Sequence, residues 1–158
     1  PIYNHILTLK ADRYSPIDQD CLPLPVIRSV GEKLDFRKGK SLKSVLDSFG
    51  DIDNNFFLTE YDKKTNPKDL IHAATLYSPQ SKREMKIWTT EPCVQVYTGN
   101  AMQNLKSFGK SCKKHTAICL ETQKVPNAIN TSKFKQSVIL APKTHYYHET
   151  VHTFSLKN

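Results

Sequence analysis

The residue best suited to proton-transfer chemistry is Glu121, in the segment 117–130, which reads Ala-Ile-Cys-Leu-Glu-Thr-Gln-Lys-Val-Pro-Asn-Ala-Ile-Asn. The first half of this segment alternates as a β-strand does, so Ile118 and Leu120 face one side and Glu121 faces the other. A carboxylate held on a rigid strand can act as a general base. The alternative interpretation is a solvent-facing glutamate on a half-buried sheet, since glutamate is rarely buried without a partner.

A strand needs neighbours, and several other runs of the sequence alternate in the same way. Val94 and Val96 face one side of their segment, whereas Gln95 faces the other. A helical stripe is visible in residues 41–49, where Ser41 is the expected N-cap. Further strand-like runs cover residues 2–10, 70–77 and 85–89. The sequence therefore predicts a fold that is nearly all β, with at most one or two short helices.

The charge of the chain bears on its partners. The 158 residues carry a formal net charge of +8, and a basic surface attracts nucleic acid and acidic molecules. No recognition-helix pattern, zinc-ligand spacing or RNA-binding aromatic motif accompanies the lysines. We therefore expect no nucleic-acid partner and interpret the lysines mainly as solvated loop residues, with a polyanion contact as the alternative. No apolar run is long enough to span a membrane.

The cysteines and the length of the chain limit the classes of protein to which it can belong. The four cysteines show no CxxC spacing and could form two disulfides, but nothing marks a secreted chain. Reduced thiols in a cytoplasmic protein are the expectation. The length suits one domain. The chain opens with Pro1 rather than Met, which suggests a fragment, a processed chain or an incomplete record.

The segment around Glu121 resembles the signature of the aldose 1-epimerase (galactose mutarotase) family. The family reads Leu-Glu-Thr-Gln, two residues, Pro-Asp-Ala, one residue, Asn, and here Asn127 takes the place of the Asp. Residues 89–100 resemble a second family motif: Thr-Thr, one residue, Pro, two residues, Gln, one residue, Tyr-Thr-Gly-Asn. Residues 51–58 resemble a third, Gly-Tyr/Phe-Asp-His-Asn-Phe. All three segments occur in the family's order.

The resemblance assigns roles to three side chains. It makes Glu121 the catalytic base, Asp53 a contact of sugar hydroxyls and Gln95 a further residue of the sugar pocket. A neutral amide can both donate and accept hydrogen bonds, which suits hydroxyl groups. We therefore expect the three side chains to converge on one concave face. The alternatives are an Asx turn around Asp53 and an exposed glutamine beside a turn at Gln95.

A fold and a domain organisation also follow from the resemblance. It covers nearly the whole chain but only the C-terminal half of the family's domain, so residues 1–158 are expected to form a single region of that domain. The implied fold is a large antiparallel β-sandwich, the galactose mutarotase-like supersandwich, whose final strand pair corresponds to residues 137–140 and 146–156. Half of such a sandwich exposes strand edges and apolar faces. An N-terminal half, a partner chain or a rearranged packing is therefore expected.

Two functions remain open. The first is an aldose 1-epimerase that interconverts the α and β anomers of aldohexoses such as galactose or glucose, with no cofactor and no metal. The family's general acid is a His in an Asn-His, one residue, Tyr-Phe-Asn segment, and none of the six histidines here matches it. The chain alone is therefore expected to be inactive. The second is a catalytically inactive relative that acts as a carbohydrate-binding or structural interaction protein.

Departures from the family pattern separate these two functions. Three turn glycines of the family are lost, in the segment 22–25, at Asp51 and at Lys82, and the motif His is missing, which favours the inactive relative. Retention of Asp53, Gln95 and Glu121 favours the enzyme. The sequence of any segment preceding Pro1 would decide between them.

Overall fold

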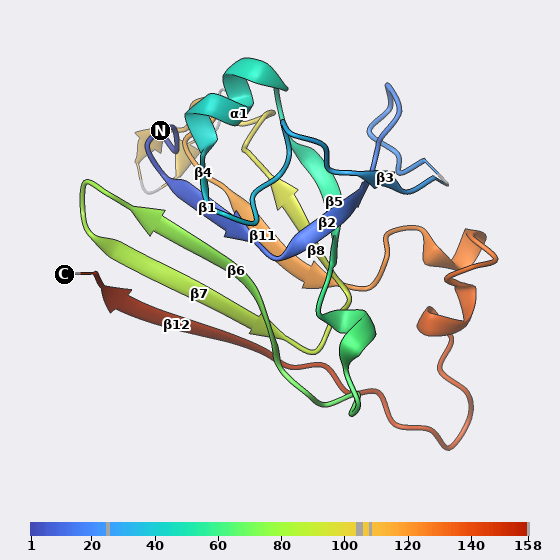
Figure 1. Ribbon diagram of the computed structural model, residues 1–158. Coiled ribbons are helices and arrows are strands. Elements are labelled where there is room, and N and C mark those ends of the chain that lie inside the picture. Colours follow the sequence, from blue (N-terminus) through green and yellow to red (C-terminus); the bar gives the residue numbers. More distant parts are fainter. Residues whose placement is uncertain (25, 104–105, 108, 158) are drawn as a thin grey trace.

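The computed structural model describes residues 1–24, 26–103, 106–107 and 109–157, and shows two antiparallel β-sheets that pack against each other (Figure 1). The consecutive strands β1 (Ile6–Leu9) and β2 (Ala11–Ser15) belong to different sheets. The chain therefore crosses from one layer to the other at a single residue, Lys10. Strands dominate the fold, which confirms the all-β prediction.

The first sheet has the strand order β12-β7-β6-β1-β4 within the described residues, and neighbouring strands are antiparallel. Besides β1 it contains β4 (Lys40–Ser41), β6 (Ile71–Ser78), β7 (Arg83–Thr89) and β12 (Thr150–Leu156). Strands β6 and β7 coincide with the runs predicted at 70–77 and 85–89. Lys82, in the turn between them, has a φ of 55°, a conformation that glycine adopts more easily.

The second sheet has the order β11-β8-β5-β2-β3 in the described part of the chain. Besides β2 it contains β3 (Arg28–Ser29), β5 (Asp53–Leu58), β8 (Cys93–Tyr97) and β11 (Cys119–Gln123). Two short strands, β9 (Lys106–Ser107) and β10 (Lys110–Ser111), pair separately. Asp53, Gln95 and Glu121 thus lie on three adjacent strands of one sheet.

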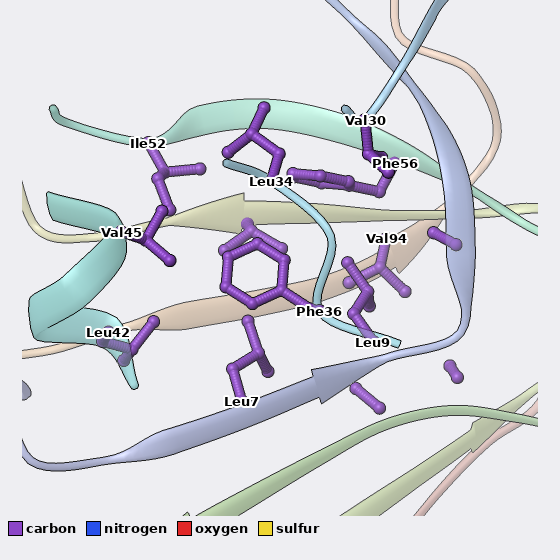
Figure 2. Packing of buried hydrophobic residues seen from close by; sticks show 14 of the residues in the cluster. Leu7, Leu9, Val30, Leu34, Phe36, Leu42, Val45, Ile52, Phe56 and Val94 are labelled. Carbon is purple, nitrogen blue, oxygen red and sulfur yellow. The ribbon is translucent and has the colours of Figure 1, made fainter. Parts of the chain in front are cut away.

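The core lies between the two sheets. Figure 2 shows the ring of Phe36 at its centre, with Leu7 of β1 beneath it and side chains of the helix α1 (Leu42–Ser48) closing one end. Phe36 packs edge-on against Phe56 of β5, with ring centroids 6.1 Å apart, and both rings are fully buried. Burying one such side chain contributes roughly 1.5–3 kcal/mol. The core therefore fixes β5 against β1 and holds the second sheet in place.

The start of α1 is capped differently from the prediction. Ser41 occupies the N-cap position, but its side chain makes no capping hydrogen bond. The backbone N–H groups of Leu42 and Lys43 donate instead to the carbonyls of His5 and Tyr3. The prediction of a Ser41 cap was wrong because the N-terminal segment crosses the helix start and supplies the acceptors.

Three 3-10 helices complete the described elements: η1 (Tyr61–Lys63), η2 (Ala128–Asn130) and η3 (Lys135–Val138). The prediction of a strand at 137–140 was wrong, since residues 137 and 138 lie in η3. The carbonyl of Thr131 accepts hydrogen bonds from the N–H groups of Phe134 and Lys135, which winds the chain into turns there. Of the final strand pair only 150–156 is a strand. No helix among the described elements is long and apolar enough to cross a membrane.

One end of the first sheet presents apolar side chains to solvent. Leu76, Met85 and Phe154 lie opposite one another on β6, β7 and β12, and with Leu156 they line a hollow of about 650 Å³. Phe154 is 75% exposed and Leu156 is 71% exposed. We call these four residues the apolar strip. Within the described residues β12 pairs with β7 alone, so its outer edge is free.

Candidate functional site

A row of polar side chains crosses the second sheet. Glu121 of β11 lies directly opposite Gln95 of β8, and Gln95 lies opposite Asn55 of β5. Asn55 in turn lies opposite Ser15 of β2. Directly opposed residues in an antiparallel sheet point to the same face, with Cβ atoms about 4.5–5.5 Å apart. The four side chains therefore form one continuous row, which we call the polar row.

Asp53 joins this row from a neighbouring position. It lies two residues before Asn55 on β5, so the period of the strand places both on one face. Gln95 Nε2 donates a hydrogen bond to Asp53 Oδ1 at 2.8 Å. The opposite face of the same strands carries Phe56, Val94 and other side chains of the core. Apolar packing on one face thus fixes the orientation of the polar groups on the other.

The row lines a concave pocket of about 340 Å³, which is within the range of small-molecule sites. Its lining residues are Ser15, Ile17, Cys21, Pro23, Asp53, Asn55, Gln95, Glu121, Gln123 and Pro126. Two carboxylates and several neutral hydrogen-bonding groups are therefore present, and no cationic side chain is among these described lining residues. Such a lining suits a neutral, hydroxyl-rich ligand better than an anion.

Glu121 is exposed at the mouth of the pocket, where a ligand can reach it. Its charge acts on Cys119, two residues away on the same face of β11. Partial burial raises the pKa of the Cys119 thiol, and the negative charges of Glu121 and Asp53 raise it further. The two carboxylates thus make this end of the sheet electronegative although the whole chain is strongly basic.

Asp53, Gln95 and Glu121 are therefore brought together in one pocket by three adjacent strands. Their catalytic and binding roles stay predictions. Sequence reasoning did not single out Asn55 and Gln123, which line the same pocket. The period of two along each strand could have found both, because each lies two residues after a predicted site residue.

Other titratable side chains form separate contacts. Asp51 accepts a hydrogen bond from His115 Nε2 at 2.9 Å and pairs with Lys114 at 2.6 Å. His72 lies beside Trp88, and its Nε2 is 2.9 Å from Thr75 Oγ1, so this half-buried histidine has a hydrogen-bond partner. In the described ranges no group of three or more His, Cys, Asp or Glu side chains is placed to hold a metal ion.

Solved structures share this arrangement of sheets. The aldose epimerase homologue from C. elegans has a TM-score of 0.87 and 31% identity, over 99% of this chain and 47% of that one. The galactose 1-epimerase from Lactobacillus acidophilus has a TM-score of 0.77 and 24% identity, over 99% and 45%. The fold is therefore a galactose mutarotase-like β-sandwich, which confirms the fold prediction.

The chain belongs to the aldose 1-epimerase family, because the family model for aldose 1-epimerase matches residues 1–153. Galactose mutarotase from Rattus norvegicus is 38% identical over 160 residues, and that from Homo sapiens is 36% identical. Each alignment covers 98% of this chain and 45% of the relative. The aldose 1-epimerase of Escherichia coli is 29% identical over 162 residues. The chain thus spans about 45% of the length of these curated relatives.

Proposed function

We propose that this protein is an aldose 1-epimerase that interconverts the α and β anomers of an aldohexose such as galactose or glucose. The observation that carries the proposal is the pocket shared by Glu121, Gln95 and Asp53. Its neutral and acidic lining suits a sugar, and the relatives are named galactose mutarotases. The sugar would bind with its hydroxyls on Asp53 and Gln95 and its anomeric hydroxyl at Glu121.

Glu121 would act as the general base. Its carboxylate removes the proton of the anomeric hydroxyl, the bond between the anomeric carbon and the ring oxygen breaks, and an acid protonates that oxygen. The open-chain aldehyde then rotates about its first carbon–carbon bond. Reversal of both proton transfers closes the ring on the other face and returns each proton to its donor. Only protons pass between the protein and the sugar, and catalysis of each proton transfer typically contributes about 10²–10⁴-fold to the rate.

The acid is proposed to come from outside these 158 residues. The described residues that line the pocket include no His, Lys or Tyr, so these common general acids are missing from the described lining. The relatives extend well beyond the matched part. We propose that this further part of the domain, or a partner chain that replaces it, covers the apolar strip and completes the pocket.

The chain by itself is therefore expected to bind an aldohexose without accelerating mutarotation above the buffer rate. The test is polarimetry of freshly dissolved α-D-galactose with the purified chain and with Glu121→Gln. The same assay is repeated after adding a polypeptide equivalent to the unmatched part of the rat relative. Acceleration that appears on addition and vanishes in Glu121→Gln supports the proposal. A large rate for the chain alone would show that an acid within it completes the site.

A catalytically inactive relative that binds carbohydrate or acts in a structural interaction is the second candidate. The pocket's lack of an acid among its described residues favours it. Sugar binding that persists without acceleration in any combination would establish this alternative. In either case we propose a cytoplasmic location, supported by free thiols at Cys21, Cys93, Cys112 and Cys119.

A further inference from the structure

We propose that Asn55 is a sugar-contacting residue, whose side-chain amide exchanges hydrogen bonds with a hydroxyl of the aldohexose. The inference rests on the proposed function, because it adds a residue to the same pocket. Asn55 lies within the family motif at residues 51–58, but the resemblance gave it no role.

The position of Asn55 is central to the polar row. It lies opposite Gln95 on one side and opposite Ser15 on the other, and it lines the pocket that Glu121 also lines. Strand β5 is an inner strand of the sheet, with β8 and β2 as its neighbours. The backbone of Asn55 is therefore fixed by pairing on both sides, and its side chain has little freedom to leave the pocket.

The amide of Asn55 is buried without a partner. The residue is 2% exposed, and neither Oδ1 nor Nδ2 has a hydrogen-bond partner among the described residues. A carboxamide offers two donors and an acceptor with two lone pairs, and buried polar groups are satisfied in the great majority of cases. Because this amide opens on a pocket, a bound ligand can supply the missing partners.

The surroundings offer only weak substitutes. The thiol of Cys93 lies beside the amide: burial raises the pKa of Cys93 to about 12, and interaction with Asn55 partly opposes this rise. A thiol is a poor hydrogen-bond acceptor and donor, so it does not satisfy a carboxamide. A sugar hydroxyl both donates and accepts hydrogen bonds, so it is a stronger partner for the Asn55 amide than the Cys93 thiol is.

The adjacent residue Asn54 provides an internal contrast. Its side chain points to the other face of β5, is equally well buried, and donates through Nδ2 to the carbonyl of Ser15 at 3.1 Å. Asn54 therefore has a structural hydrogen bond, whereas Asn55 has none in the described chain. These two neighbouring asparagines are both buried, but among the described residues only the side chain of Asn54 has a hydrogen-bond partner.

This difference gives a signature that a purely structural residue would not show. Asn55→Leu replaces an unsatisfied buried amide by an apolar side chain of similar size, which costs no hydrogen bond in the free protein. We expect its urea-unfolding midpoint to equal or exceed that of the unchanged chain. Its affinity for D-galactose should nevertheless fall about tenfold, the equivalent of one hydrogen bond.

The experiment is calorimetric titration of the whole chain with D-galactose and with its 2-, 3-, 4- and 6-deoxy derivatives. The proteins compared are the unchanged chain, Asn55→Leu, Asn55→Ala and the control Asn54→Ala. Asn54→Ala should unfold more easily but bind galactose as before. The inference predicts that at least one deoxy sugar binds Asn55→Leu and the unchanged chain equally well, because that sugar lacks the hydroxyl which Asn55 contacts.

Each other outcome overturns the inference. If the unchanged chain binds galactose and Asn55→Leu binds it equally well, Asn55 makes no contact, while the proposed sugar site stands. If Asn55→Leu weakens every sugar by the same factor, the leucine acts sterically rather than by loss of a hydrogen bond. If the unchanged chain binds none of the sugars, the sugar site itself fails, and Asn55 fails with it.

Discussion

Gln95 donates a hydrogen bond to Asp53 at 2.8 Å across two adjacent strands. The contact joins a neutral donor to a carboxylate. It leaves Oδ2 of Asp53 and the side-chain oxygen Oε1 of Gln95 available to a ligand. Groups held in this way lose little further freedom when a sugar binds. The pair is thus pre-organised by the sheet rather than assembled by the ligand.

The first prediction concerns this pair. Gln95→Glu places a second carboxylate against Asp53, and two carboxylates in contact raise the pKa values of the pair. Groups with a raised folded-state pKa stabilise the protein at low pH and lose that contribution as the pH rises. We therefore expect Gln95→Glu to lose about 1 kcal/mol or more of unfolding free energy between about pH 4 and pH 7.

Urea unfolding across that range, with Gln95→Met as an uncharged control, measures the effect. The methionine variant removes the same hydrogen bond but adds no charge, so its loss of stability should not depend on pH in this way. Identical pH profiles for the two variants would show that the side chain at 95 does not face Asp53 in solution.

The second prediction concerns ligand charge. The pocket has two carboxylates and no cation among its described lining residues, although the chain as a whole carries a net charge of +8. The two pocket carboxylates should repel an anionic sugar, so D-galactose should bind at least about fivefold more tightly than D-galacturonate, which keeps the pyranose ring and carries a carboxylate at C6. This factor is equivalent to about 1 kcal/mol of local repulsion. Calorimetry at low and high salt checks this, and the gap should narrow as salt screens the charges. Tighter binding of galacturonate would mean that the overall charge dominates.

The sequence predicted those features that depend on short-range pattern. The period of two located most strands and assigned the correct faces to Gln95 and Glu121, because apolar packing on one face leaves little choice. The polar row itself could not be predicted, since strand register and sheet order bring Asn55 opposite Gln95 although the two residues are 40 positions apart in the sequence. The contact of Asp51 with His115 depends on the same long-range arrangement. Likewise, residues 137–140 have strand-like composition, but no strand pairs with them among the described elements.

The third prediction concerns His72. Burial lowers the pKa of His72 below its usual value of 6.5, and the positive charges of Lys10 and Lys86 add to the effect. The unfolded chain therefore binds this proton more readily than the folded chain does. Neutral His72 makes its full contribution to the free energy of unfolding above about pH 6.5. This contribution is lost as the pH falls through the lowered pKa of the folded state.

His72→Gln should accordingly reduce the loss of stability between about pH 7.5 and about pH 5.5. Urea unfolding at these two values measures it. The matched control is His152→Gln, since His152 is an exposed side chain on β12 and its replacement should leave the pH dependence in place. An equal effect of the two replacements would contradict the assignment to His72.

The fourth prediction concerns Gly99, which follows β8 and approaches the strand that carries Glu121. Gly99 has a φ of 69°, and a Cβ added there would lie 2.9 Å from the carbonyl oxygen of Ala117. Gly99→Ala therefore incurs both a left-handed backbone cost of about 1–2 kcal/mol and a backbone clash. The clash should displace the start of β11 and weaken galactose binding as well as stability.

Gly31→Ala is the control for the backbone cost alone. Gly31 has a φ of 56°, and a Cβ there would meet none of the described atoms within 4 Å. Denaturant unfolding and galactose titration of both variants separate the two effects. Gly99→Ala should be the less stable variant and the only one of the two with reduced affinity. Equal affinities would show that β11 keeps its position despite the clash.

The last prediction concerns the apolar strip. Phe154 and Leu156 are largely exposed and lie beside the edge of β12 with which no described strand pairs. Exposed apolar side chains next to an unpaired strand edge promote association between chains. We expect the isolated chain to self-associate as its concentration rises, and Phe154→Thr with Leu156→Thr to reduce this while keeping the strand, because threonine has a high β propensity.

Analytical ultracentrifugation over a range of concentrations measures the association. Val151→Thr is the control, since Val151 points to the other face of β12 and should leave association unchanged. The double threonine variant should also respond less to the added polypeptide in the polarimetric assay, because the strip is the surface that polypeptide is proposed to cover. If association falls but the response does not, the added polypeptide binds elsewhere, and the pocket is completed without the strip.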